Sequence, residues 1–202
     1  LSARVIRYTN SILRSAFNYA LGQEILTRNP TKFVELPRLT QREMMVLSQD
    51  EAKQFLNASK GERLATLYSF LLLSGCRPEE ALGLTWKDLD FKKSNVIIRR
   101  VLIWHRKGGK WEFNQPKTKK SNRTIPLPLQ LMKELKKHRI KQNEEKLRVG
   151  WQDFDLVFPS QVGTPLTMSR VTRVFQRIKK KAEIVKPLRL YDLRHSTATL
   201  LL

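Results

Sequence analysis

The chain has 202 residues, of which 39 are lysine or arginine and 18 are aspartate or glutamate, so its formal net charge is +21. This excess is far larger than solubility requires and points to a polyanionic partner, with nucleic acid the first candidate and an anionic membrane surface the second. A hydrophobic content of 41% argues against a disordered chain. The single cysteine excludes an internal disulfide framework. The sequence contains no apolar run near the roughly 20 residues of a membrane span.

The N-terminal stretch predicts one long helix followed by a break. Residues 2–26 place apolar side chains near the helical period, and Ser2 is a suitable N-cap. Pro30 disfavours helical backbone in the residue before it, so the helix should end by this turn. Because Pro37 and a basic turn follow, we interpret residues 27–46 as a linker.

The next segments predict short helices around a buried one. Ser48 and Glu51 have the spacing of a capping box, and a short helix should follow to about Ala58. Residues 63–74 are too apolar for a surface helix, so we expect the central core helix there. A glycine directly after this stretch should end it. The proline at 78 suits the first turn of another short helix.

The middle of the chain predicts a small sheet. The β-branched residues of 95–104 indicate a strand, and two further strands at 111–113 and 123–127 would complete one antiparallel sheet. Three more segments follow: a basic amphipathic helix over 129–148, an extended segment at 155–159, and a helix with a basic face over 169–182.

The last stretch predicts a helix that places Arg194 and His195 near its start. This helix runs into three leucines with no Gly, Asn or Pro to close it. We therefore expect the chain to be a piece of a longer protein.

Two segments allow more than one local interpretation. Arg77 lies in the turn before a predicted helix, where a guanidinium and a helix N-terminus together form a good anion site. The local sequence allows equally well a surface ion pair with Glu79 or Glu80. The segment 116–126 carries several lysines, and composition alone would make it a solvated basic loop.

Three motifs, in this order along the chain, resemble those of the tyrosine recombinases, the phage-integrase family. The segment 75–80 (G-C-R-P-E-E) resembles the first arginine box of that family. The segment 117–126 (K-T-K-K-S-N-R-T-I-P) resembles its lysine box, and 191–195 (Y-D-L-R-H) resembles its second arginine box.

The resemblance implies roles for individual residues. The implied catalytic residues are Arg77, Lys117, Tyr191 and Arg194, with Glu80 and His195 in support. Tyr191 stands where the family usually has histidine, and tyrosine is a poor general base at neutral pH because phenols ordinarily ionise at about pH 10. We do not expect Tyr191 to be the nucleophile, which in the family pattern would lie beyond Leu202. The implied DNA-binding residues are Lys119, Lys120, Arg123, Arg170, Arg173 and Arg177, and a solvated basic face is the alternative for the last three.

The resemblance also implies an α+β, mainly α-helical fold. A tyrosine-recombinase catalytic domain with a small antiparallel β-sheet would follow the last helix of a helical core-binding domain. The implied division is the end of the core-binding domain at 1–36, a linker at 37–46, and a catalytic domain at 47–202 that is truncated before the nucleophile.

The function so implied is site-specific recombination, the integration or excision of a phage, transposon or conjugative element. The reaction would be a metal-free transesterification through a 3′-phosphotyrosine, with no cofactor, and the fragment alone would be inactive. The implied partners are double-stranded DNA at attachment sites, three further copies in a homotetramer on DNA, and DNA-bending accessory proteins, in the bacterial cytoplasm and away from membranes. His105, His138 and His195 lack the spacing of metal ligands.

Two alternatives belong to other functional classes. The first is a non-catalytic integrase remnant that binds DNA without cutting it, which Tyr191 and the expected truncation both favour. The second is a type IB topoisomerase, against which the core-binding-like junction at 27–46 argues.

Overall fold

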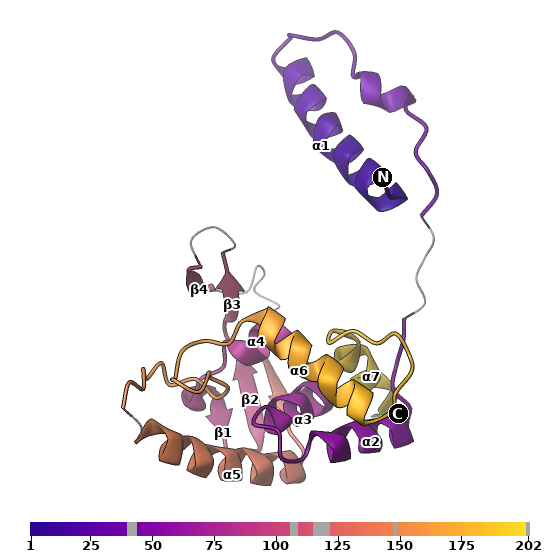
Figure 1. Cartoon of the computed structure of the whole chain (residues 1–202). Helices are drawn as coiled ribbons and strands as arrows, with labels where there is room; N and C mark the ends of the chain where they lie inside the picture. Colours follow the sequence, from indigo (N-terminus) through magenta and orange to yellow (C-terminus); the bar gives the residue numbers. More distant parts are fainter. Residues whose placement is uncertain (40–43, 106–108, 115–121, 148, 201–202) are drawn as a thin grey trace. The chain divides into compact units, whose positions relative to one another are not determined.

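The computed structural model describes residues 1–39, 44–105, 109–114, 122–147 and 149–200 (Figure 1). The chain forms two compact units, Leu1–Glu43 and Met44–Leu202.

The first unit consists of a long helix and a short 3₁₀ turn. Helix α1 (Ala3–Gly22) begins at the predicted cap, where the Ser2 hydroxyl accepts a hydrogen bond from the Val5 amide. The helix ends four residues earlier than predicted, because Glu24 adopts a left-handed backbone with φ 58°. The turn η1 (Pro30–Phe33) is capped by Asn29.

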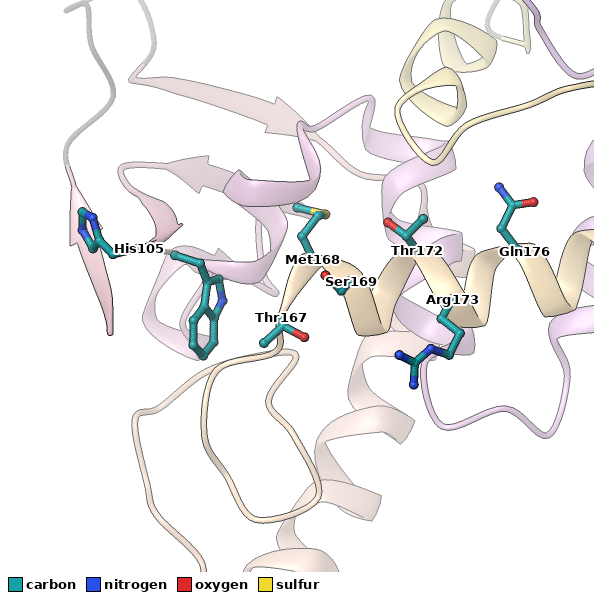
Figure 2. A pocket seen from close by; sticks show the side chains of 8 residues that line it. His105, Thr167, Met168, Ser169, Thr172, Arg173 and Gln176 are labelled. Carbon is teal, nitrogen blue, oxygen red and sulfur yellow. The ribbon is translucent and has the colours of Figure 1, made fainter. Parts of the chain in front are cut away.

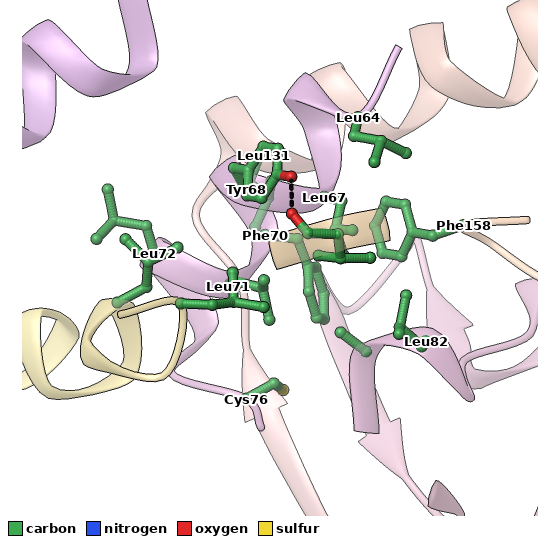
Figure 3. Close-up of a cluster of buried hydrophobic side chains, with 14 of the residues drawn as sticks. Leu64, Leu67, Tyr68, Phe70, Leu71, Leu72, Cys76, Leu82, Leu131 and Phe158 are labelled. Carbon is green, nitrogen blue, oxygen red and sulfur yellow. Dashed lines mark hydrogen bonds between the residues drawn. The ribbon is translucent and has the colours of Figure 1, made fainter. Parts of the chain in front are cut away.

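Helix α3 (Ala65–Ser74) is the centre of the second unit, as the sequence predicted. It contacts four other helices: α2 (Gln49–Ser59), α4 (Pro78–Leu82), α5 (Leu129–Lys146) and α7 (Asp192–Leu200). Helix α6 (Met168–Lys181) packs against α2. Figure 3 shows the core around α3, formed by Leu67, Tyr68, Phe70, Leu71, Leu82, Leu131 and Phe158.

Local signals correctly predicted the start of α2, the end of α3 and the start of α4. Ser48 and Glu51 form the predicted capping box at the start of α2. Gly75 ends α3 in the left-handed conformation, with φ 61°, and Pro78 occupies the first turn of α4. Arg63, which the sequence predicts inside the core helix, lies before it and donates to both carboxylate oxygens of Glu145.

The predicted single strand at 95–104 was wrong, because the segment divides into two strands of two different sheets. Strand β2 (Asn95–Ile98) lies between β1 (Leu89–Asp90) and β5 (Arg123–Pro126) in an antiparallel sheet. Strand β3 (Val101–Trp104) forms a separate antiparallel pair with β4 (Trp111–Asn114).

The two arginines between these strands explain the break. Arg99 and Arg100 both pair with the buried carboxylate of Asp88, at 3.6 and 3.2 Å. Neighbouring side chains of a regular strand point to opposite faces, so both cannot reach one carboxylate without a bend. The predicted extended segment at 155–159 forms only isolated bridges, Thr85 with Leu156 and Pro159 with Pro165.

Candidate functional site: a two-arginine corner

The first predicted arginine lies at a sharp corner between α3 and α4. Arg77 is the N-cap of α4, and its backbone amide donates to Oε2 of Glu80 at 2.9 Å. Its guanidinium Nη1 donates to Oε1 of the same carboxylate at 3.0 Å. Glu80 has a side-chain exposure of only 1%, whereas the side chain of Arg77 is 45% exposed. The buried carboxylate therefore holds Arg77 from one side and leaves its other side open to a ligand.

A second arginine shares the same carboxylate. Arg123, at the start of β5, donates to both oxygens of Glu80, at 3.0 and 2.7 Å. Burial raises the pKa of Glu80, but hydrogen bonds from Arg123 and Arg77 outweigh it, so the pKa lies below its usual range. The predicted DNA contact of Arg123 stays a prediction.

Arg194 reaches the same corner from the far end of the chain. Its Nη1 donates to the Gly75 carbonyl at 2.7 Å. The hydroxyl of Thr197, one turn later, donates to the Leu72 carbonyl at 2.8 Å and so fixes α7 on α3. Two consecutive turns of α7 therefore hold the C-terminal end of α3, and Arg194 lies beside the segment that carries Arg77.

Tyr191 joins this group. The pKa of Arg77 is raised above its usual range, first by its bond to Glu80 and then by the Tyr191 hydroxyl beside the guanidinium. The Tyr191 side chain is half-exposed, and its ring centroid lies 6.2 Å from that of His195. The structure thus brings together four of the predicted site residues, Arg77, Glu80, Tyr191 and Arg194, with His195 next to them.

This corner can bind the negatively charged oxygens of a phosphate group, including oxygens on which charge builds up during a reaction. Two guanidiniums offer several N–H groups at one place, and each matches the oxygens of a phosphate. The neighbouring thiol of Cys76 is unsuited to nucleophilic chemistry, because burial raises its pKa to about 11. Its side chain is buried.

The predicted lysines lie outside the described residues. Lys117, Lys119 and Lys120 fall within 115–121, so their roles remain predictions.

The basic face of α6 lies at a different place. Arg170 and Arg173 are exposed there, whereas Arg177 pairs with Glu62. An open hollow of about 750 Å³ lies between the end of β3 and the start of α6 (Figure 2). Its lining includes His105, Ser169 and Arg173 but none of the corner residues named above.

Within the described ranges, no group of three or more His, Cys, Asp or Glu side chains is arranged to hold a metal ion. None of the described helices is long and apolar enough to span a bilayer.

Two features of this site escaped the sequence analysis. The partner of Arg194 is a backbone carbonyl, for which a sequence carries no signal. The Arg123–Glu80 pair joins residues 43 positions apart. The sequence offered Arg77 as the partner of Glu80 and gave no signal that Arg123 shares the same carboxylate.

The family model described as the phage integrase family matches residues 45–202. The chain therefore belongs to this family, whose members are recombinases that cleave and rejoin DNA. It is 34% identical to the "Tyrosine recombinase XerC-like" protein of Caldanaerobacter subterraneus, over 98% of this chain and 55% of that protein. It is 29% identical to the ICEBs1 integrase of Bacillus subtilis, over 100% of this chain and 55% of that protein. The chain thus spans about half the length of these curated relatives.

Solved structures agree with this assignment. The Tn1549 transposon integrase in complex with transposon right end DNA superimposes with a TM-score of 0.83 at 26% identity, covering 100% of this chain and 67% of that chain. A lambda integrase dimer bound to a COC' core site superimposes with a TM-score of 0.58 at 19% identity, covering 95% and 64%, and shares the fold. The predicted mainly helical α+β fold with antiparallel strands is confirmed, with two small sheets in place of one.

Proposed function

We propose that this chain supplies the phosphate-binding part of the active site of a site-specific DNA recombinase, which integrates or excises a mobile element. The observation that carries the proposal is the convergence of Arg77 and Arg194 on one corner, with Glu80 buried behind the first of them. Membership of the phage integrase family supports the same function.

In this proposal the two arginines perform the main catalytic work. A phosphodiester carries one negative charge, and attack at phosphorus builds up more charge on the nonbridging oxygens. Arg77 and Arg194 would bind those oxygens more strongly in the transition state than in the ground state, which is what accelerates the reaction. Lys117 would protonate the leaving 5′ oxygen as general acid.

The nucleophile of the proposed reaction is a tyrosine located beyond Leu202. Its attack would form a 3′-phosphotyrosine and conserve the bond energy for rejoining. We therefore expect residues 1–202 alone to bind DNA without cleaving it. In this proposal residues 1–36 belong to the core-binding domain, residues 47–202 belong to the catalytic domain, and residues 37–46 link the two.

The proposed partner is double-stranded DNA at an attachment site, bound by a homotetramer of the full-length protein. The net charge of +21 supports a DNA partner. The Tn1549 integrase structure in complex with transposon right end DNA supports a DNA partner, and the lambda integrase dimer on a core site supports binding by more than one copy. Basic side chains on α6, Arg170 and Arg173, are proposed to contact phosphates or bases. DNA-bending accessory proteins are proposed to assist assembly.

A non-catalytic DNA-binding remnant is the second candidate, and Tyr191 is the observation that favours it. A histidine at this position would exchange protons near neutral pH, whereas a tyrosine ordinarily does not.

Covalent trapping tests the proposal. The full-length protein is incubated with a suicide duplex that carries its attachment site, in the presence of EDTA. We expect a covalent protein–DNA band that disappears in both Arg77→Ala and Arg194→Ala. The matched control is Arg139→Ala, which removes an exposed arginine of α5 that stacks on Trp86, remote from the corner in sequence and contacts.

Two other outcomes separate the alternatives. A wild-type protein that shifts the duplex but forms no covalent band would favour the DNA-binding remnant. Relaxation of a supercoiled plasmid without an attachment site would favour a topoisomerase.

A further inference from the structure

The carboxylate of Glu80 receives more donors than one catalytic arginine supplies. Oε1 accepts from Nη1 of Arg77 and from Nη1 of Arg123, each at 3.0 Å. Oε2 accepts from the Arg77 backbone amide at 2.9 Å and from Nη2 of Arg123 at 2.7 Å. Arg123 thus binds both oxygens in the fork geometry of a bidentate pair, whereas the Arg77 side chain contributes a single N–H.

Exposure separates the two arginines further. The side chain of Arg123 is 27% exposed and that of Arg77 is 45% exposed, around a carboxylate that is 1% exposed. Charge interactions strengthen as water is excluded, so the more enclosed and doubly bonded arginine compensates most of the carboxylate's charge. The more exposed guanidinium, which has the Tyr191 hydroxyl beside it, keeps N–H groups and most of its own charge for a ligand outside.

Loss of Arg123 would change this balance. Glu80 is too buried to be solvated, and a buried unpaired charge is strongly disfavoured. Arg77 already donates to that carboxylate, so in the absence of Arg123 its guanidinium would turn inward to bind both oxygens. A guanidinium in that position no longer faces a phosphate.

We propose that Arg123 is a positioning residue that neutralises Glu80 and thereby leaves Arg77 free to bind the scissile phosphate. This role differs from the DNA contact that the resemblance implied for Arg123, because Arg123 acts through Glu80 on a second arginine. The kinetic part of the argument rests on the proposed recombinase function, whereas the orientation of Arg77 does not.

The kinetic test compares Arg123→Gln, Arg123→Lys, Glu80→Gln and the double variant Arg123→Gln/Glu80→Gln in the full-length protein. We expect Arg123→Gln to lower the single-turnover cleavage rate by about 10- to 100-fold, the range seen when a group that orients a functional side chain is removed. The concentration of protein at half-maximal rate should change little. Arg123→Lys keeps the charge and should restore most of the rate.

The double variant gives the sharpest kinetic outcome. Without the carboxylate there is no charge for Arg123 to neutralise, so the double variant should cleave as fast as Glu80→Gln alone. Multiplied losses from the two substitutions would contradict the proposal. A phosphate contact by Arg123 makes a different prediction: weaker DNA binding and a salt dependence of log K reduced by about 0.9. That result, with an unchanged cleavage rate at saturation, would also overturn the proposal.

A second measurement needs no activity. Phenylglyoxal modifies accessible arginines, and mass spectrometry of the full-length protein follows the peptide that contains Arg77. We expect Arg77 to react several-fold more slowly in Arg123→Gln than in wild type, and at the wild-type rate in Arg123→Lys. Arg139→Gln is the control. An unchanged rate in Arg123→Gln would refute the positioning role, whereas absence of cleavage by the wild type would refute only the proposed function.

Discussion

Substitution of Tyr191 by phenylalanine removes one hydroxyl group and nothing else from the two-arginine corner. That hydroxyl lies beside the Arg77 guanidinium, on a side chain that is 40% exposed. Even one full hydrogen bond from that hydroxyl would contribute only about 0.5–1.5 kcal/mol net, which corresponds to about a 2- to 13-fold change in rate. A general acid or base would contribute about 10²- to 10⁴-fold. The structure therefore predicts a loss at the small end, about 2- to 13-fold.

The assay for Tyr191→Phe is single-turnover formation of the covalent complex on a suicide duplex, with the full-length protein. The unfolding midpoint should stay at the wild-type value, because the hydroxyl lies at the surface. Tyr191→His, which introduces the usual residue of the family, is the companion variant and should cleave at least as fast as wild type. A loss of more than 100-fold in Tyr191→Phe at unchanged DNA affinity would refute the reasoning, because it would assign proton transfer or attack to this tyrosine.

Three further predictions concern the scaffold of the site. Tyr68→Phe deletes a buried hydroxyl that donates to the Val171 carbonyl at 2.8 Å, and denaturant titration followed by tryptophan fluorescence should show a loss of about 1 kcal/mol; a gain in stability would contradict this. Burial lowers the pKa of His138 despite its hydrogen bond to a backbone carbonyl. The free energy of unfolding should therefore be constant with respect to this group above about pH 6.5. At lower pH it should decrease by at most about 1.4 kcal/mol per pH unit. His138→Gln should lack this pH dependence, and equal slopes in the two proteins would refute it. Arg63→Ala breaks an ion pair with Glu145 that has side-chain exposures of 24% and 20%, and should cost about 2–4 kcal/mol in the same titration, while a cost under about 0.5 kcal/mol would show that solvent replaces the pair.

The features that sequence analysis predicted correctly are those set within a few residues. Ser48 and Glu51 satisfy each other's amides across a single turn. Gly75 adopts a left-handed backbone that other residues disfavour, and Pro78 has the fixed φ of a first helical turn. The apolar composition of 65–74 allowed no position other than the core, and α3 occupies it.

The features that could not be predicted depend on contacts between distant segments. The β-branched run at 95–104 favours a strand throughout, yet the buried carboxylate of Asp88 draws two successive arginines to one side and divides it. In the same way, the sequence around Arg123 resembles the lysine box of the family, and only the folded chain places Glu80 against its guanidinium. Tertiary electrostatics decided the first case against the local pattern, and in the second it made an ion pair that no local pattern predicts.

The corner at Gly75 has a consequence for how this site can be altered. The carbonyl of Gly75 receives Arg194, and a Cβ on this residue would meet Thr197 at 3.4 Å on a backbone with φ 61°. The contact of Arg194 at this corner is therefore made with main chain rather than with an adaptable side chain. Substitution of neighbouring side chains should leave this main-chain contact of Arg194 in place. A recombinase with a different spacing between its two arginines would need a different backbone conformation at Gly75. Such a change would move the residue that precedes Arg77 and the carbonyl that holds Arg194 at the same time.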